Sequence, residues 1–174
     1  MSASVQNATG TTQASGGRAG GEQLQLVSFE VGGEEFAVDI LAVQEINRML
    51  ELTRVPQSPP EVEGVINLRG KIIPVLDLRK RFGMLVSDRS EHNRIVVVEV
   101  NHRVLGFIVD RVHEVLRIGS DIVEPAPPMV CSIDSEFISG VAKFNDRLII
   151  LLDLARLFAA QAGTNEAHSS AHAA

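Results

Sequence analysis

An internal repeat is the feature that most constrains the fold of this chain. The segment that begins at Leu26 (LVSFEVGGEEFAVDILAVQEI) aligns with the one that begins at Ile95 (IVVVEVNHRVLGFIVDRVHEV), at an offset of 69 residues. The segment from Gly64 (GVINLRGKIIPVLDLRKRF) aligns with the one from Gly140 (GVAKFNDRLIILLDLARLF), at an offset of 76 residues. Self-similarity of this kind predicts two copies of one structural unit, with a longer middle loop in the second copy.

Each copy contains short apolar runs separated by turn residues. In the first copy, the runs on either side of Gly32–Gly33 predict one β-hairpin, with alternating apolar positions in its second strand. The runs on either side of Arg69–Gly70 predict another hairpin, in which Pro74 is expected at a sheet edge or a bulge because proline has no N–H to donate.

The segment between the two hairpins has a different spacing. Ile40, Val43 and Ile46 recur at intervals that fit a helix, so a short helical turn is predicted there. The sequence TRVPQSPP at residues 53–60 then predicts a proline-rich loop.

Short strands with Gly and Pro turns are typical of a small barrel or sandwich. The sequence therefore predicts a mainly β fold of two lobes, about 22–90 and 91–158. We expect the lobes to pack through a shared apolar seam, and the repeat allows a segment of one copy to lie in the lobe of the other. Residues 1–21 have almost no large apolar side chains and residues 159–174 have none, so both are predicted to be disordered tails.

Composition argues against several classes of protein. The net charge is −6, and the chain has no Trp or Tyr, so neither bulk positive charge nor base-stacking aromatics favour nucleic-acid binding. No run approaches the ~20 apolar residues of a membrane-spanning helix. The first residues lack a basic start followed by an apolar stretch, which predicts a cytoplasmic protein.

No group of residues predicts catalysis or a cofactor. Asp77 and Asp153 occupy matching LDL segments, where they are interpreted as carboxylates at strand ends or turns. Cys131 is the only cysteine, which excludes an intramolecular disulfide and a zinc site of paired cysteines. The histidines lack the spacing of a helical zinc site, and no phosphate-binding loop is present. We expect no enzyme activity, no cofactor and no metal.

Charged residues suggest two candidate contacts. Residues 69–81 carry five basic side chains and one acid, which fits either a strand edge protected against aggregation or a docking surface for an acidic partner. Glu45, matched by Glu114 in the second copy, fits either a solvated helix face or a partner contact. Both alternatives stay open at this point.

Five stretches together carry a resemblance to a known family: VGGEEFAVDILAVQEI, TRVPQSPPEVEGVINLRGKIIPVLDLRKRFG, LGFIVDRVHEVLRI, EPAPP and EFISGVAKFNDRLIILLDLARLF. Over residues 24–158 and in this order, the chain resembles CheW, the family of chemotaxis coupling proteins. The resemblance implies two five-stranded, SH3-like β-barrels with a hydrophobic cleft between them, short helices, no catalysis and no cofactor.

The resemblance also implies partners. It places this chain between the cytoplasmic tip of methyl-accepting receptors and the regulatory domain of the histidine kinase CheA, in membrane-associated receptor arrays, so that receptor state controls autophosphorylation. Glu45 and Arg69 match an acidic and basic pair linked to partner coupling. The residues that match the receptor-facing cleft are Ile40, Val43, Gly64, Val112, Val115 and Gly140.

Three alternatives remain. The chain fits a CheW-like scaffold of another chemosensory array, for motility or biofilm control. A small-ligand-binding double barrel would need a pocket with converging polar groups. A nucleic-acid-binding barrel would have to use the basic residues of segment 69–81.

Overall fold

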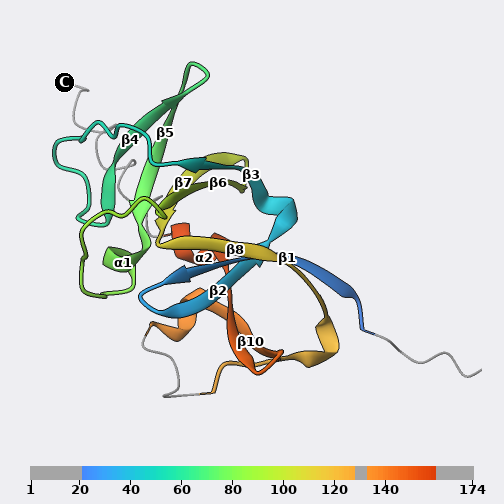
Figure 1. Cartoon of the computed structure of the whole chain (residues 1–174). Helices are drawn as coiled ribbons and strands as arrows, with labels where there is room; N and C mark the ends of the chain where they lie inside the picture. The colour runs from blue at the N-terminus through green and yellow to red at the C-terminus, as the bar shows by residue number, and fades with distance from the viewer. Residues whose placement is uncertain (1–20, 128–132, 160–174) are drawn as a thin grey trace, which may run out of the picture.

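The structure is a computed structural model that describes residues 21–127 and 133–159 (Figure 1). The predicted tails, apart from the few residues next to the folded body, and Cys131 lie outside the described residues. The elements run β1 (Gln23–Val31), β2 (Glu34–Asp39), η1 (Ile40–Ala42), β3 (Val43–Arg48), β4 (Val62–Leu68), β5 (Lys71–Asp77), α1 (Leu78–Arg81), β6 (Arg94–Val100), β7 (Arg103–Val109), β8 (Arg111–Gly119), η2 (Ser120–Ile122), β9 (Val123–Glu124), η3 (Ser135–Phe137), β10 (Ile138–Phe144), β11 (Arg147–Leu152) and α2 (Leu154–Ala159).

The described strands form two sheets with the same topology. The first sheet has the order β8-β1-β2-β11-β10-β9, and the second sheet has the order β3-β6-β7-β5-β4. In both sheets one pair is parallel, β2 with β11 and β7 with β5, and the other pairs are antiparallel. The predicted repeat and the mainly β fold are therefore confirmed.

The two copies exchange their first hairpins. Strands β1 and β2 of the first copy lie in the sheet of β8–β11, whereas β6 and β7 of the second copy lie in the sheet of β3–β5. In Figure 1, β3–β7 occupy the upper part of the view and β1, β2, β8 and β10 the lower part. The division between the sheets therefore does not fall at a single point near residue 90, because segments of both halves cross.

Each sheet closes on itself. In the second sheet, Thr53 lies beyond the end of β3 and exchanges backbone hydrogen bonds with Val65 of β4, at 2.9 and 2.8 Å. In the first sheet, the chain continues from β8 through η2 into β9, which pairs with β10. The two-residue strand β9 makes the first sheet six-stranded rather than five-stranded, and its counterpart in the second sheet is the single bridge at Thr53.

Both hairpins of the first copy are confirmed, and their turns need left-handed backbone. Gly32 and Gly33 have φ values of +62° and +82°, and Arg69 and Gly70 have +53° and +81°. Positive φ at both central residues is the geometry of a type I′ turn, whose twist matches that of the flanking strands.

Pro74 does not lie in an edge strand or at a bulge, so its expected place is wrong. The reason for the expectation still holds, because the missing N–H of proline costs no hydrogen bond of the sheet. Strand β5 is an inner strand, between β7 and β4. Pro74 pairs with Val65 of β4, and pairing with β7 begins only at Val75. The proline therefore lies in the half of β5 that has one hydrogen-bonded neighbour, where its missing N–H removes no ladder bond to a second strand.

The helical turn predicted from Ile40, Val43 and Ile46 is correct only for η1; Val43 and Ile46 belong to strand β3. Strand β3 has a bulge between Val43, which pairs with Val98, and Glu45, which pairs with Val97. A bulge inserts one extra residue, so that residues three apart lie on the same face of a strand. The helix-like spacing of Val43 and Ile46 is therefore the spacing of a bulged strand.

The hydrophobic core has three parts. One cluster lies within each barrel, built from β1, β2, β8, β10 and β11 in the first and from β4–β7 in the second. The third cluster, called the shared core here, takes buried side chains from both sheets and from α1 and α2, which confirms the predicted apolar seam. It contains the phenylalanines Phe29, Phe36, Phe82, Phe107, Phe137 and Phe158.

Candidate functional site

Strands β3 and β8, each at one end of its sheet's strand order, carry three of the six residues predicted for the cleft. Val43 in β3 and Val112 in β8 occupy equivalent repeat positions, and both are half-buried against the shared core. Ile46 and Val115, three residues further along each strand, are 40% and 52% exposed. The repeat thus places an apolar pair in each strand, Val43 with Ile46 in β3 and Val112 with Val115 in β8. Each pair is partly exposed to solvent.

The turn η1 adds a residue that sequence reasoning missed. Ile40 is half-buried and packs against the shared core, whereas the next residue, Leu41, is 87% exposed. Leu41 N donates a hydrogen bond to Asp39 Oδ1 at 2.9 Å, so Asp39 caps the turn. The sequence does contain a signal for this residue. An apolar residue two positions after a capping aspartate breaks the alternation of apolar and polar residues that marks a strand.

Gly64 and Gly140 are buried and lie at equivalent bulges in β4 and β10. A Cβ on Gly64 would lie 2.5 Å from the carbonyl oxygen of Thr53. A Cβ on Gly140 would lie 2.6 Å from Val123 Cγ1 and 3.0 Å from Glu124 O. The absence of a side chain at both glycines therefore lets the segment that closes each barrel approach closely. That either glycine belongs to a partner-binding surface stays a prediction.

The structure brings Glu45 and Arg69 together. Arg69 Nη1 lies 3.0 Å from Glu45 Oε2, with the arginine side chain 81% exposed and the glutamate 21% exposed. Asn47 Nδ2 also donates to Glu45 Oε1 at 2.6 Å. Glu45 is in strand β3, so its interpretation as part of a solvated helix face is wrong. The pair presents its cationic end, at the β4–β5 turn, to solvent.

Segment 69–81 is not a free positive patch, because most of its cations have partners within the chain. Arg81 also lies over the ring of Phe137, 4.6 Å from its centroid. The ion pairs are Arg69 with Glu45, Arg79 with Asp110, Lys80 with Glu63 and Arg81 with Glu61. The docking-surface interpretation thus loses most of the charge on which it rested.

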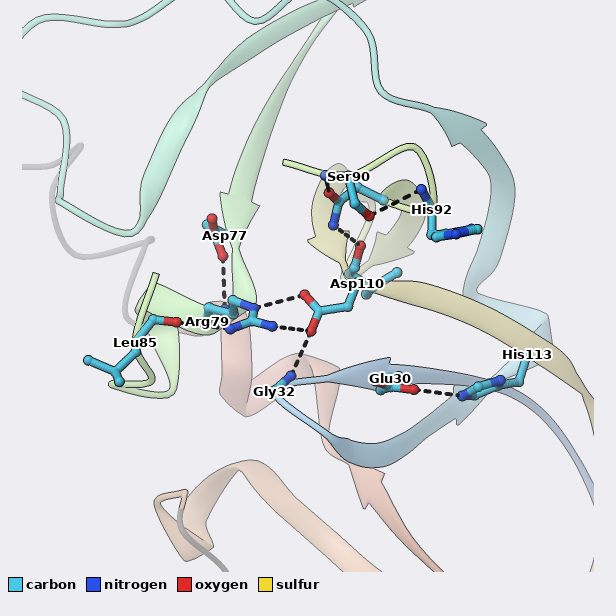
Figure 2. A network of polar contacts seen from close by, with 11 residues as sticks. Glu30, Gly32, Asp77, Arg79, Leu85, Ser90, His92, Asp110 and His113 are labelled. Carbon is cyan, nitrogen blue, oxygen red and sulfur yellow. Dashed lines mark hydrogen bonds and ion pairs between the residues drawn. The ribbon is translucent and has the colours of Figure 1, made fainter. Parts of the chain in front are cut away.

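The pair of Arg79 and Asp110 has the most directional geometry of these ion pairs (Figure 2). Arg79 Nε donates to Asp110 Oδ1 at 2.8 Å, and Arg79 Nη2 lies 2.5 Å from Oδ2. The backbone N–H of Gly32 also donates to Asp110 Oδ2, at 2.8 Å. These three residues are called the clasp below. Such two-pronged, charge-assisted contacts are stronger than neutral hydrogen bonds and fix orientation.

The clasp changes the protonation behaviour of its members. Partial burial alone would raise the pKa of Asp110, but the hydrogen bonds from Arg79 and Gly32 outweigh it and hold this pKa below its usual range. The hydrogen bond to Asp110 raises the pKa of Arg79. Asp110 is therefore ionised throughout the neutral range.

Acid should weaken the clasp. Because the folded-state pKa of Asp110 is depressed, its contribution to stability is present above the unfolded pKa and is lost as pH falls through the folded pKa. Urea unfolding of the wild type and Asp110→Asn at several pH values should show a stability difference near neutrality that shrinks below about pH 4. A difference that stays constant down to about pH 2.5 would contradict this assignment.

Asp77 and Asp153 are confirmed as carboxylates at strand ends. Asp77 Oδ1 accepts from the N–H of Arg79 at 2.9 Å, and Asp153 Oδ1 accepts from the N–H of Arg156 at 3.1 Å, so each carboxylate binds the first turn of a short helix. Their own N–H groups each donate to a backbone carbonyl at 2.8 Å. The two aspartates thus have equivalent structural roles in the two copies.

The described part of the chain has neither a metal-binding cluster nor a membrane-spanning helix. Within residues 21–127 and 133–159, no three His, Cys, Asp or Glu side chains are grouped so that they could hold a metal ion. Among the helices of those residues, none has the length and apolar character needed to cross a membrane.

Comparison with known proteins supplies the family. The family model described as the CheW-like domain matches residues 25–162. The Probable chemotaxis protein CheW of Rhizobium etli is 36% identical over 134 residues, which is 77% of this chain and 86% of the relative. The chemotaxis protein CheW of Helicobacter pylori is 38% identical over 131 residues, which is 75% of this chain and 79% of the relative.

One solved structure is similar to this chain in both sequence and fold. The crystal structure of the scaffolding protein TtCheW from Thermoanaerobacter tengcongensis aligns with a TM-score of 0.73 and 43% sequence identity, over 79% of this chain and 88% of that one. The family model covers the double barrel described above, and the two relatives and this structure each align with 75–79% of the chain. The chain therefore belongs to the CheW family.

Proposed function

We propose that this chain is a non-enzymatic chemotaxis adaptor that couples methyl-accepting receptors to the histidine kinase CheA. In this proposal it binds the cytoplasmic tip of the receptors and the regulatory domain of the kinase, so that receptor state controls autophosphorylation. It works in the cytoplasm, at membrane-associated receptor arrays. Family membership over 25–162 is the observation that carries the proposal.

The geometry of β3, η1 and β8 suits a helical partner. Leu41, Ile46 and Val115 are exposed apolar side chains, and Val43 and Val112 are half-buried behind them. An amphipathic helix binds by inserting its apolar stripe into such a surface, while charges at the rim set its orientation. The receptor surface that we propose consists of these five residues with Ile40.

Binding to receptors tests the proposal directly. Membranes that contain a methyl-accepting receptor should co-sediment the purified protein, and membranes without receptor should not. Equal sedimentation with both membranes would refute the receptor-binding half of the proposal.

The Glu45–Arg69 pair should matter for coupling far more than for folding. An exposed ion pair contributes only ~0.2–1 kcal/mol to stability, and Arg69 is 81% exposed. We expect Glu45→Arg or Arg69→Glu to leave the melting temperature nearly unchanged and to reduce kinase activation, because each reversal sets like charges against each other. The double reversal should restore part of the activation.

The readout is a double-mutant cycle of kinase activation in receptor membranes. Strictly additive losses would show that the two residues act independently. A matching fall in thermal stability would show instead that the pair serves the barrel, and that the partner surface lies elsewhere.

A further inference from the structure

The chain crosses between the two sheets at equivalent repeat positions, and the two crossovers differ in what holds them. The first runs from β2 through η1 to β3, and the second runs from β7 through Asp110 to β8. Leu41 and Asp110 are equivalent residues, at the offset of 69. Leu41 is 87% exposed, whereas the Asp110 side chain is 20% exposed and ion-paired.

The clasp ties the second crossover to both sheets (Figure 2). Arg79 lies in α1, directly after β5 of the second sheet, and Gly32 lies in the β1–β2 turn of the first sheet. Asp110 accepts from both, and its own N–H donates to Glu30 O in β1 at 2.9 Å. One carboxylate therefore joins elements of the two barrels at the point where the chain passes between them.

The first crossover has no equivalent of the clasp. Ala155 occupies the repeat position of Arg79, and Asn101 occupies that of Gly32. Leucine and alanine have no charged groups, so an ion pair between Leu41 and Ala155 is chemically excluded. Among the described residues, the place beside the β6–β7 turn and α2 is a hollow of about 270 Å³, lined by Val100, Asn101, Arg103, Leu105, Ala155, Phe158 and Ala159.

The first copy fills the equivalent space with its own chain. Met84 follows α1 and packs against the shared core, and its Sδ lies so near Gly32 that a Cβ there would be 2.5 Å from it. Met84, Arg79 and Gly32 thus close the barrels against each other at the second crossover. The contact between the barrels is therefore filled and directional at the second crossover, whereas the described residues leave a hollow at the equivalent place in the other copy.

We propose that Arg79 and Asp110 are positioning residues that fix the orientation of the two barrels, and with it the placement of β3 relative to β8. Burial in the shared core keeps the barrels together but is non-directional. The two-pronged contact of a guanidinium with a carboxylate is directional, so it adds an orientational restraint between the two barrels. The link to kinase control rests on the proposed function, because β3 and β8 carry the proposed receptor surface.

Barrel orientation can be measured without any partner. Spin labels at Ile72→Cys in β5 and Leu148→Cys in β11, which are 64% and 47% exposed, report the distance between the second and first sheets. The background is Cys131→Ala, which removes the single native cysteine. The wild-type clasp should give one narrow distance distribution.

Clasp variants should broaden or shift this distribution. Arg79→Gln and Asp110→Asn remove the ion pair. Arg79→Lys keeps the positive charge but cannot make the two-pronged contact, so it should give a distance distribution of intermediate width. Arg103→Gln is the matched control, because it removes an exposed arginine beside the open hollow. Distributions that stay as narrow as the wild type in folded Arg79→Gln and Asp110→Asn proteins would overturn the proposal.

A second readout separates positioning from stability. Well below the melting temperature, the clasp variants should bind receptor membranes and CheA within about twofold of the wild type but lose roughly fivefold to tenfold in kinase activation. Altered distances with intact activation would overturn the link to coupling. If the wild type itself fails to couple, the proposed function fails, while the distance measurement still decides the role of the clasp.

Discussion

Gly64→Ala should be the most damaging single substitution in the scaffold, with a loss of about 3–5 kcal/mol in the free energy of unfolding. The added Cβ would lie 2.5 Å from the Thr53 carbonyl oxygen, which is backbone and cannot rotate away. Gly64 also has a φ of +155°, which side chains rarely adopt. Relief of the clash requires the Thr53–Val65 bridge to open, and with it the closure of the second barrel.

Gly33→Ala is a control that separates the effect of the steric clash from the effect of the unusual backbone φ. Gly33 has a φ of +82°, and a Cβ there would meet nothing within 4 Å, so Gly33→Ala should cost only about 1 kcal/mol. Urea unfolding measures both values, and amide exchange at Thr53 and Val65 should accelerate only in Gly64→Ala. Equal costs for the two variants would contradict the account of barrel closure.

Leu41→Asp should have the largest effect on receptor binding, with a loss of tenfold or more, roughly the cost of removing an interface hot spot. Leu41 is 87% exposed, so a receptor helix that covers it would have to strip water from the new carboxylate. The hydrogen bond of this residue to Asp39 uses its backbone N–H, which the substitution keeps. Stability should change by no more than about 0.5 kcal/mol, as is usual for a surface position.

Leu85→Asp is the matched control, because Leu85 is an equally exposed leucine, at 89%, in the loop after α1. It should retain receptor binding in co-sedimentation. The same substitution at Val43 is less informative, since Val43 is half-buried against the shared core and a charge there would also destabilise the fold. Equal binding by Leu41→Asp and Leu85→Asp would remove η1 from the proposed receptor surface.

Much of the fold could be predicted because the repeat and the turns are local signals. Gly32–Gly33 and Arg69–Gly70 mark hairpins in the sequence, and the structure has both. The exchange of hairpins between copies could not be predicted, because a repeat gives the number of units but not which copy supplies a given strand. The sequence predicts a helical turn where β3 has its bulge, because an extra residue in a strand produces the helix-like spacing of Val43 and Ile46.

The candidate site was predicted unevenly for a similar reason. Resemblance placed Glu45 and Arg69 together, and they form an ion pair, although they are 24 positions apart in sequence. It could not show that Gly64 closes a barrel, because that depends on the approach of Thr53 from outside its hairpin. The partner of Arg79 is also distant in sequence, so the sequence alone predicts a positive patch where the structure has an ion pair with Asp110.

The most direct test of the adaptor function measures CheA autophosphorylation in receptor-containing membranes, with and without this protein. We expect the kinase to sediment with the membranes and to become active only when the protein is present, and attractant to inhibit that activity. Leu41→Asp should abolish the effect, while Leu85→Asp should preserve it. Kinase binding, activity and attractant response that do not depend on the protein would contradict its function as a coupling adaptor.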